Sequence, residues 1–245
     1  MRERQLRLEG LHNIRDLGGL TLPEGGVTRF GSVLRGCSMR ELTPRGRAAL
    51  AAHEFAMVID LRSDRERETH PTWITAAPGV TTLHVPLFAG LSPVYKMANS
   101  SRGFSLVERY AAALDQAGPH FAQAIRAVAE APKGAVLIHC TAGKDRTGLL
   151  AALLLSLAGV PKPEIVADYH MSVTEGRPYI ERLKRSSQAR KTAPRLLERM
   201  LDAPPAVMEE TLSLLEHRHG GARAYLTAAG LSAETAEAAA RRLKG

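Results

Sequence analysis

A cysteine, a lysine, an aspartate and an arginine lie within seven residues of one another in the segment IHCTAGKDRTG, residues 138–148. One apolar run ends at Cys140 and another follows Arg146. This pattern predicts a hydrophobic strand, a tight loop containing Gly143, and a helix that begins near Arg146. In such an arrangement the loop amides and the N-terminus of the helix point at one place, which favours an anion. The segment therefore predicts an anion site with a thiol at its rim.

The same residues predict a reaction. Amide dipoles and the helix end stabilise a thiolate, so we expect a lowered pKa for Cys140 and a sulfur that is nucleophilic at neutral pH. Arg146 is planar and always charged, and it can hold two oxygens of a tetrahedral anion. This pair predicts attack of the sulfur on the phosphorus of a monoester, followed by hydrolysis of the phosphocysteine. The residues expected to bind the equatorial oxygens are Thr141, Ala142, Gly143 and Lys144, through loop amides, together with Arg146.

Two other uses of the segment fit less well. A nucleotide-binding Walker loop has glycine five residues before Gly143 and serine or threonine after Lys144, whereas this chain has Ile138 and Asp145 there. An inert core cysteine has no use for three charged residues close behind it.

The elements that must position this loop can be predicted from local patterns. Runs rich in β-branched residues predict strands at 55–61, 81–87 and 134–140. Helical patterns lie between and after these runs, and the chain reads as helical from Lys162 onward. Strands that alternate with helices predict an α/β fold with a central, mostly parallel sheet flanked by helices.

Several helix boundaries can be predicted as well. Thr43 is placed to cap a helix with Pro44 in its first turn. Gly118-Pro119 separates two helical patterns. The helix after the charged loop runs from 146 to 158 and is closed by Gly159.

Composition narrows the class of protein. The chain has 245 residues and a formal charge of +8, but arginine supplies 26 of its 33 basic residues, a bias that a GC-rich genome produces. No basic patch is interleaved with aromatic residues, so we expect no nucleic acid partner. The N-terminus lacks the apolar part of a signal peptide, and no apolar stretch is long enough to span a bilayer. With two cysteines and no metal-type spacing, we expect a cytoplasmic protein without metal or cofactor.

The segment HCTAGKDRTG resembles the CX5R signature of the cysteine-dependent protein tyrosine phosphatase superfamily, with Cys140 as nucleophile and Arg146 as phosphate-binding arginine. Further segments in family-like order are NIRDLGGL, VLRGCSM, VIDLRSDRERE, VADYHMS and ARAYLTAAGLS. Together they resemble bacterial atypical tyrosine phosphatases with the GKDRTG loop, some of which act on phosphotyrosine and on inositol lipids. The resemblance implies a tyrosine-phosphatase-like core in a single domain, 1–245, with a helical lid or cap roughly at 162–215.

The resemblance also implies roles for the neighbours of Cys140. His139 would orient the loop through hydrogen bonds rather than transfer protons. Thr147 would offer its hydroxyl to the thiolate or assist hydrolysis of the phosphocysteine. Loop packing is the alternative for both.

The leaving group needs a proton, which the usual member of the superfamily supplies from a Trp-Pro-Asp loop that this chain lacks. Myotubularin-like lipid phosphatases place an aspartate inside the phosphate-binding loop, so Asp145 is by resemblance the expected general acid. Its alternative role is to cap the helix. Asp60, at the carboxyl end of a predicted strand, is the second candidate, and it could equally pair with Arg15, Arg35 or Arg62.

Substrate choice depends on the basic residues. Lys144 resembles the loop lysine of inositol-lipid phosphatases, whose headgroups carry several phosphates; its alternative is a solvated lysine. The segment 182–195 has six basic residues and no carboxylate. A solvated helix face is its default interpretation, and holding a lid or contacting an anionic membrane transiently is the other hypothesis. Cys37 is by default a core residue, and a reversible disulfide with Cys140 is the other hypothesis.

The predicted function is hydrolysis of phosphotyrosine in proteins, with phosphoserine, phosphothreonine and phosphoinositides as further substrates. The alternatives are an enzyme that acts primarily on phosphoinositides and a silent module that binds phosphate. Intact Cys140, Asp145 and Arg146 argue against the silent module. A sulfur transferase or arsenate reductase does not fit the residues inside the loop or the flanking RDLGG and DLRS segments.

Overall fold

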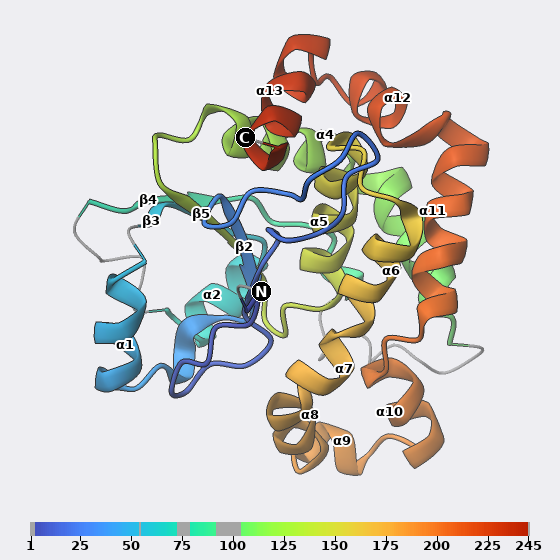
Figure 1. Ribbon diagram of the computed structural model, residues 1–245. Coiled ribbons are helices and arrows are strands. Elements are labelled where there is room, and N and C mark those ends of the chain that lie inside the picture. The colour runs from blue at the N-terminus through green and yellow to red at the C-terminus, as the bar shows by residue number, and fades with distance from the viewer. Residues whose placement is uncertain (1–2, 54, 73–78, 92–103, 245) are drawn as a thin grey trace.

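The computed structural model describes residues 3–53, 55–72, 79–91 and 104–244. A five-stranded sheet with the order β1-β2-β5-β3-β4 lies between α1 on one side and the larger group of helices on the other (Figure 1). Its strands are β1 (Arg15–Asp16), β2 (Val33–Gly36), β3 (Phe55–Asp60), β4 (Thr81–His84) and β5 (Ala135–His139). Only the β1–β2 pair is antiparallel within the described sheet. The predicted mostly parallel sheet and its three predicted strands are confirmed, and β1 and β2 add to them.

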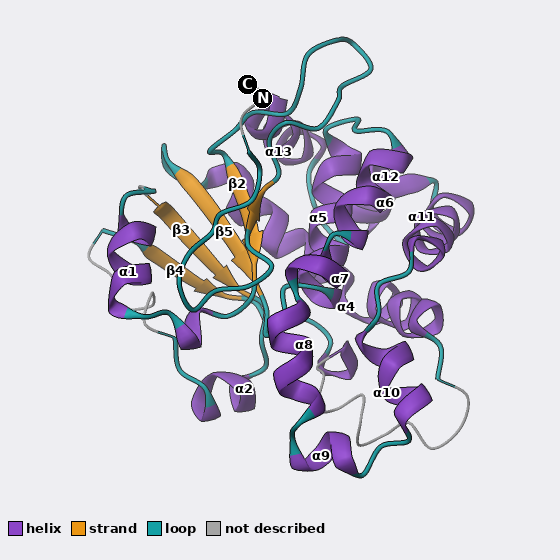
Figure 2. Ribbon diagram, turned by 60° about the horizontal axis from the view of Figure 1, so that its bottom comes forward, coloured by secondary structure: helices purple, strands orange, loops and turns teal. Residues whose placement is uncertain are grey.

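The four parallel strands end at one edge of the sheet. Their last residues are Gly36, Asp60, His84 and His139. The segments that follow them, including the charged loop, therefore start side by side. Figure 2 shows α2 (Asp64–Thr69) and α8 (Arg177–Lys184) beside this edge.

Helices cover the sheet and extend beyond it. The other α-helices are α1 (Pro44–Ala51), α4 (Leu106–Glu130), α5 (Asp145–Leu157), α6 (Lys162–His170), α7 (Ser172–Glu175), α9 (Ser187–Arg190), α10 (Pro194–Leu201), α11 (Pro205–His219), α12 (Gly221–Ala228) and α13 (Ala233–Lys244), with short 3-10 turns at Met39–Glu41 and Ala89–Leu91. Residues 162–215, called the lid segment below, are helical as predicted. Its helices α8, α9 and α10 form the lower part of the molecule in Figure 1.

Local sequence explains the helix ends and one kink. The Thr43 side chain accepts a hydrogen bond from the Gly46 amide at the start of α1, which confirms the predicted cap. Gly159 follows α5 with a φ of +79°, as expected of a helix-ending glycine. The predicted break at Gly118-Pro119 is confirmed as a kink: two helical stretches meet within α4, where Ala117 takes a non-helical φ of −113°. Proline bends a helix that packing on both sides keeps intact.

The sheet separates two hydrophobic clusters because neighbouring strand residues face opposite sides. On β5, Val136 and Ile138 belong to the larger cluster and Leu137 to the smaller one. The smaller cluster includes Leu50 of α1. The larger one includes residues of α4, α5 and the helices from α6 to α13. Every residue of α5 except Ser156 is buried, so the loop before α5 is fixed to the centre of the molecule.

Candidate active site

A glycine shapes the loop between β5 and α5. Gly143 has a φ of +68°, and a Cβ atom built there would lie 2.5 Å from the carbonyl carbon of Gly36 and 2.7 Å from the nitrogen of Cys37. Only glycine fits such a conformation and such a contact. The loop, which connects Cys140 to Asp145 at the start of α5, therefore lies directly against the end of β2.

Cys140, its chain neighbour His139 and Thr147 are all buried. Cys140 is only 2% exposed. The Nδ1 atom of His139 lies 3.3 Å from the Cys140 carbonyl oxygen. Burial lowers the pKa of His139, so its imidazole is uncharged at neutral pH. The buried Thr147 hydroxyl, in the first turn of α5, has no hydrogen-bond partner among the described residues.

Arg146 is buried against a carboxylate that the sequence analysis did not single out. Its Nη1 and Nη2 atoms donate to the two carboxylate oxygens of Glu66 at 2.6 and 2.8 Å. The Thr141 hydroxyl donates to Glu66 Oε1 at 2.5 Å. Burial alone would lower the pKa of Arg146, but its bonds with Glu66 raise that pKa above its usual value. Arg146 Nε is buried and has no hydrogen-bond partner in the described part of the chain.

Glu66 reaches this position from α2, which begins just after β3. The Ser63 side chain accepts from the Glu66 amide, and the Glu66 side chain accepts from the Ser63 amide, which is a complete capping box. The pattern Ser-x-x-Glu after a predicted strand was visible in the sequence. It would have placed Glu66 in the first turn of a helix at the edge where the strands end.

Asp145 lies in a buried cluster of hydroxyl groups. The Tyr110 hydroxyl of α4 donates to Asp145 Oδ1 at 2.8 Å, and the hydroxyls of Tyr110 and Tyr169 are 2.8 Å apart. Lys144 Nζ lies 3.4 Å from the same Oδ1 atom. Burial raises the pKa of both tyrosines, which therefore remain neutral. This arrangement fixes the direction of the Asp145 carboxyl group from α4 and α6.

Lys144 points toward the lid segment. Its ammonium group donates to the carbonyl oxygens of Met200 at 3.1 Å and Asp202 at 2.6 Å, at the end of α10. The residue is 4% exposed, so the solvated alternative does not describe this arrangement.

Asp60 is paired with an arginine. It is fully buried, and Arg62 binds both its oxygens, with Nη2 at 2.7 Å from Oδ2 and Nε at 2.9 Å from Oδ1. Burial alone would raise the pKa of Asp60, but its ion pair and hydrogen bonds with Arg62 hold that pKa well below its usual value. Of the alternatives left open by the sequence, the structure places Asp60 as the partner of Arg62.

Residues of the lid segment pack against one side of the loop. Tyr179 and Ile180 of α8 and Leu201 of α10 line a crevice whose other wall includes Ala142. Its volume of about 20 Å³ admits one water molecule. The lid segment thus lies directly against the loop.

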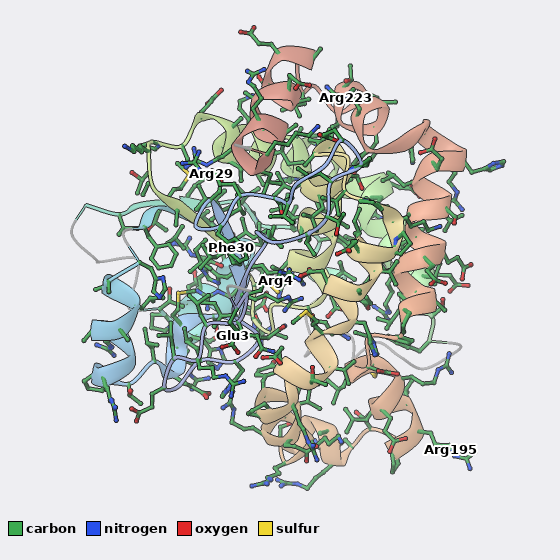
Figure 3. All side chains as sticks on the ribbon, in the orientation of Figure 1. Glu3, Arg4, Arg29, Phe30, Arg195 and Arg223 are labelled. Carbon is green, nitrogen blue, oxygen red and sulfur yellow. The ribbon has the colours of Figure 1, made fainter. Side chains whose placement is uncertain are left out.

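In the described part of the chain, some basic residues of segment 182–195 contact carboxylates, and others do not. Arg182 forms an ion pair with Glu41, and Lys184 lies 3.2 Å from Glu181. Arg195 projects away from the body of the molecule (Figure 3). The segment is therefore partly neutralised by carboxylates outside it.

Cys37 occupies the smaller hydrophobic cluster, which agrees with its default role. Its sulfur accepts a hydrogen bond from the His12 amide at 3.4 Å, and burial raises its pKa to about 11. Cys37 and Cys140 are both free thiols.

A family model described as tyrosine phosphatase family matches residues 6–245. The chain belongs to the tyrosine phosphatase family. The resemblance drawn from the HCTAGKDRTG segment is thereby confirmed, and the chain is a phosphatase that acts on phosphorylated substrates.

Three relatives show how far this similarity extends. A tyrosine-protein phosphatase of Nostoc commune is 34% identical over 206 residues, 81% of this chain and 69% of that protein. A Cupriavidus necator protein is 28% identical over 223 residues, 85% of this chain and 74% of that protein. Its name, tyrosine-protein phosphatase, is provisional. The triple specificity protein phosphatase PtpB of Mycobacterium tuberculosis is 34% identical over 111 residues, 41% of this chain and 40% of that protein.

Two further observations concern ligands and membranes. Among the described residues, no group of three or more His, Cys, Asp or Glu side chains is placed to hold a metal ion. No helix in the same part of the chain is both long and apolar enough to cross a bilayer.

Proposed function

We propose that this tyrosine phosphatase hydrolyses phosphotyrosine in proteins through a phosphocysteine on Cys140. The observation that carries the proposal is the buried Arg146. Its two terminal nitrogens are held by Glu66, and its buried Nε has no partner in the described part of the chain. A buried donor without a partner is costly, and a phosphate oxygen would satisfy it. Amides of Thr141, Ala142, Gly143 and Lys144 would complete the phosphate site.

The reaction would proceed in two balanced steps. The Cys140 sulfur forms a bond to phosphorus while the ester P–O bond breaks, and the leaving oxygen takes a proton from Asp145. Water then attacks phosphorus, the S–P bond breaks, and Asp145 takes a proton from that water. We assign Thr147 to support the departing thiolate with its unpartnered hydroxyl and His139 to orient the loop.

Asp145 is a better general acid than Asp60 on physical grounds. A general acid must reach the leaving oxygen, and Arg62 occupies both oxygens of the Asp60 carboxyl. Asp145 belongs to the loop itself and receives a hydrogen bond from the neutral Tyr110, which directs its carboxyl group. We therefore propose Asp145 as the acid.

Inositol lipids are the second candidate substrates. The lysine inside the loop and the basic residues of segment 182–195 favour polyanionic headgroups. Lys144 is turned toward the Met200 and Asp202 carbonyls, so a second phosphate would recruit it only after those bonds break. This favours phosphotyrosine as the primary substrate. Transient contact with an anionic membrane would accompany lipid hydrolysis.

The extent of the domain and its location belong to the same proposal. We infer one phosphatase domain over 1–245, supported by the family match and by a hydrophobic cluster that runs from Leu17 to Leu243. A cytoplasmic location and the absence of a nucleic acid partner remain predictions.

The test is release of inorganic phosphate from a phosphotyrosine peptide, a phosphoserine peptide and a panel of phosphoinositides, in buffer containing a chelator. Cys140→Ser should abolish turnover of all of them. Cys37→Ser, which changes the other buried thiol, should retain it. Turnover that survives Cys140→Ser would overturn the cysteine mechanism, and binding without turnover in the parent would favour the silent module.

A further inference from the structure

Three consecutive carbonyl groups of the catalytic loop accept hydrogen bonds from the N-terminal part of the chain. The Thr141 carbonyl accepts from the Ser38 amide at 3.2 Å. The Ala142 carbonyl accepts from Asn13 Nδ2 at 2.9 Å. The Gly143 carbonyl accepts from Arg35 Nη2 at 2.9 Å.

These bonds determine which way the loop amides point. In a trans peptide the N–H of one residue lies opposite the carbonyl of the residue before it. With the carbonyls of 141, 142 and 143 directed at their donors, the N–H groups of 142, 143 and 144 are directed away from them. Converging amides are what a phosphate site requires, because each N–H must be oriented before the anion arrives.

The two side-chain donors are themselves fixed. Asn13 has a φ of +55°, and its Oδ1 accepts from Arg15 Nη1 at 2.5 Å, which leaves Nδ2 for the loop. Arg35 Nη1 donates to Asp168 Oδ2 at 2.5 Å, which leaves Nη2 for the loop. Arg15 also binds Asp168, with Nε at 2.9 Å from Oδ1. All four side chains are at most 2% exposed.

We propose that Asn13 and Arg35 are positioning residues for phosphate binding, which act by orienting the loop amides rather than by touching the substrate. The inference rests on the proposed function of the loop. It predicts that loss of either donor weakens binding of a tetrahedral anion beyond what loss of an equally buried hydrogen bond does elsewhere.

The test uses two substitutions of Asn13 that differ in charge. Asn13→Asp keeps the shape and the acceptor for Arg15 but removes the donor to Ala142. Asn13→Gly removes the side chain without adding charge, and glycine accepts the positive φ without strain. Arg35→Lys keeps the charge but replaces the planar fork that reaches Asp168 and the loop together.

Thr28→Val is the matched control. The buried Thr28 hydroxyl donates to the Leu17 carbonyl at 2.7 Å and accepts from the Leu20 amide at 2.9 Å. The Thr28→Val protein therefore loses two buried hydrogen bonds, both of them outside the catalytic loop. Binding of inorganic phosphate is measured by calorimetry, with the melting temperature and the split between kcat and KM recorded for each protein.

We expect Asn13→Asp, Asn13→Gly and Arg35→Lys each to bind inorganic phosphate about tenfold more weakly than the parent, with a raised KM. Thr28→Val should lose stability and keep the parent's phosphate affinity. If the Asn13 and Arg35 variants lose only stability and bind phosphate as the parent does, the donors serve the fold and the inference fails. If Asn13→Asp alone loses affinity, added charge is the cause and the inference also fails. A parent that binds no phosphate would overturn the proposed function itself.

Discussion

Replacing Glu66 with glutamine is expected to lower the free energy of unfolding by an amount that depends on pH. Burial would raise the pKa of Glu66, but its bonds with Arg146 and Thr141 lower it from 4.5 to about 2. The Glu66 side chain is only 18% exposed, so solvent weakens this pairing little. A shift of that size corresponds to about 3 kcal/mol in favour of the folded, ionised form.

The sign of the pH dependence follows from the lowered pKa. The contribution of Glu66 is complete well above pH 4.5 and is lost as the pH falls toward 2. The parent should exceed Glu66→Gln by about 3 kcal/mol at pH 7 and by about 1 kcal/mol at pH 3. Urea unfolding of both proteins at the two pH values measures this difference, and carboxylates common to both cancel from it.

Glutamine is suited to this comparison because it retains the capping box with Ser63. Glu68→Gln, an exposed carboxylate of the same helix, is the control and should change stability by less than about 0.5 kcal/mol at either pH. A Glu66→Gln protein as stable as the parent, or a deficit equal at pH 7 and pH 3, would show that the ion pair with Arg146 is not what lowers the pKa of Glu66.

Three further outcomes are expected. Asp145→Asn should reduce kcat by about a hundredfold or more for a poor leaving group, should flatten the basic limb of the pH profile, and should matter less for a good leaving group; Asp60→Asn should instead lower stability by about 3 kcal/mol and leave that limb in place. If the two pH profiles respond the other way round, the acid is misassigned. Lys144→Met should lower the free energy of unfolding by about 2 kcal/mol, because two buried bonds to the end of α10 are lost, and denaturant unfolding will measure it; an unchanged value would contradict that contact. Thiol counting after mild peroxide should fall from two free thiols per chain to none if Cys37 forms a disulfide with Cys140, and two throughout would end that hypothesis.

The sequence predicted the loop and its strand and helix because their patterns are local. A hydrophobic run, a glycine and a buried helix follow one another without interruption between 134 and 158. β2 was not predicted because it has only four residues and carries Arg35, a charge that breaks the apolar pattern. The charge is tolerated there because Asp168, far along the chain, binds it.

The contacts of the charged residues could not be predicted in the same way. Glu66 lies in a run of charges, DRERE, that reads as a solvated helix face. Only the position of α2 at the edge of the sheet brings it to Arg146. Lys144 meets carbonyl groups 56 and 58 residues away, which depend on how the lid segment packs. Such pairings belong to the tertiary structure, and periodicity carries no information about them.

The bracing of the loop by Asn13 and Arg35 bears on how genomes are searched for active phosphatases. The motif that identifies the reaction spans ten residues, but its carbonyl groups rest on segments more than a hundred residues earlier. A gene fragment that began after those segments would still match the motif, but the loop it encodes would lack the donors to its carbonyl groups. A survey that requires both parts of the sequence would select chains in which the loop carbonyl groups have these donors.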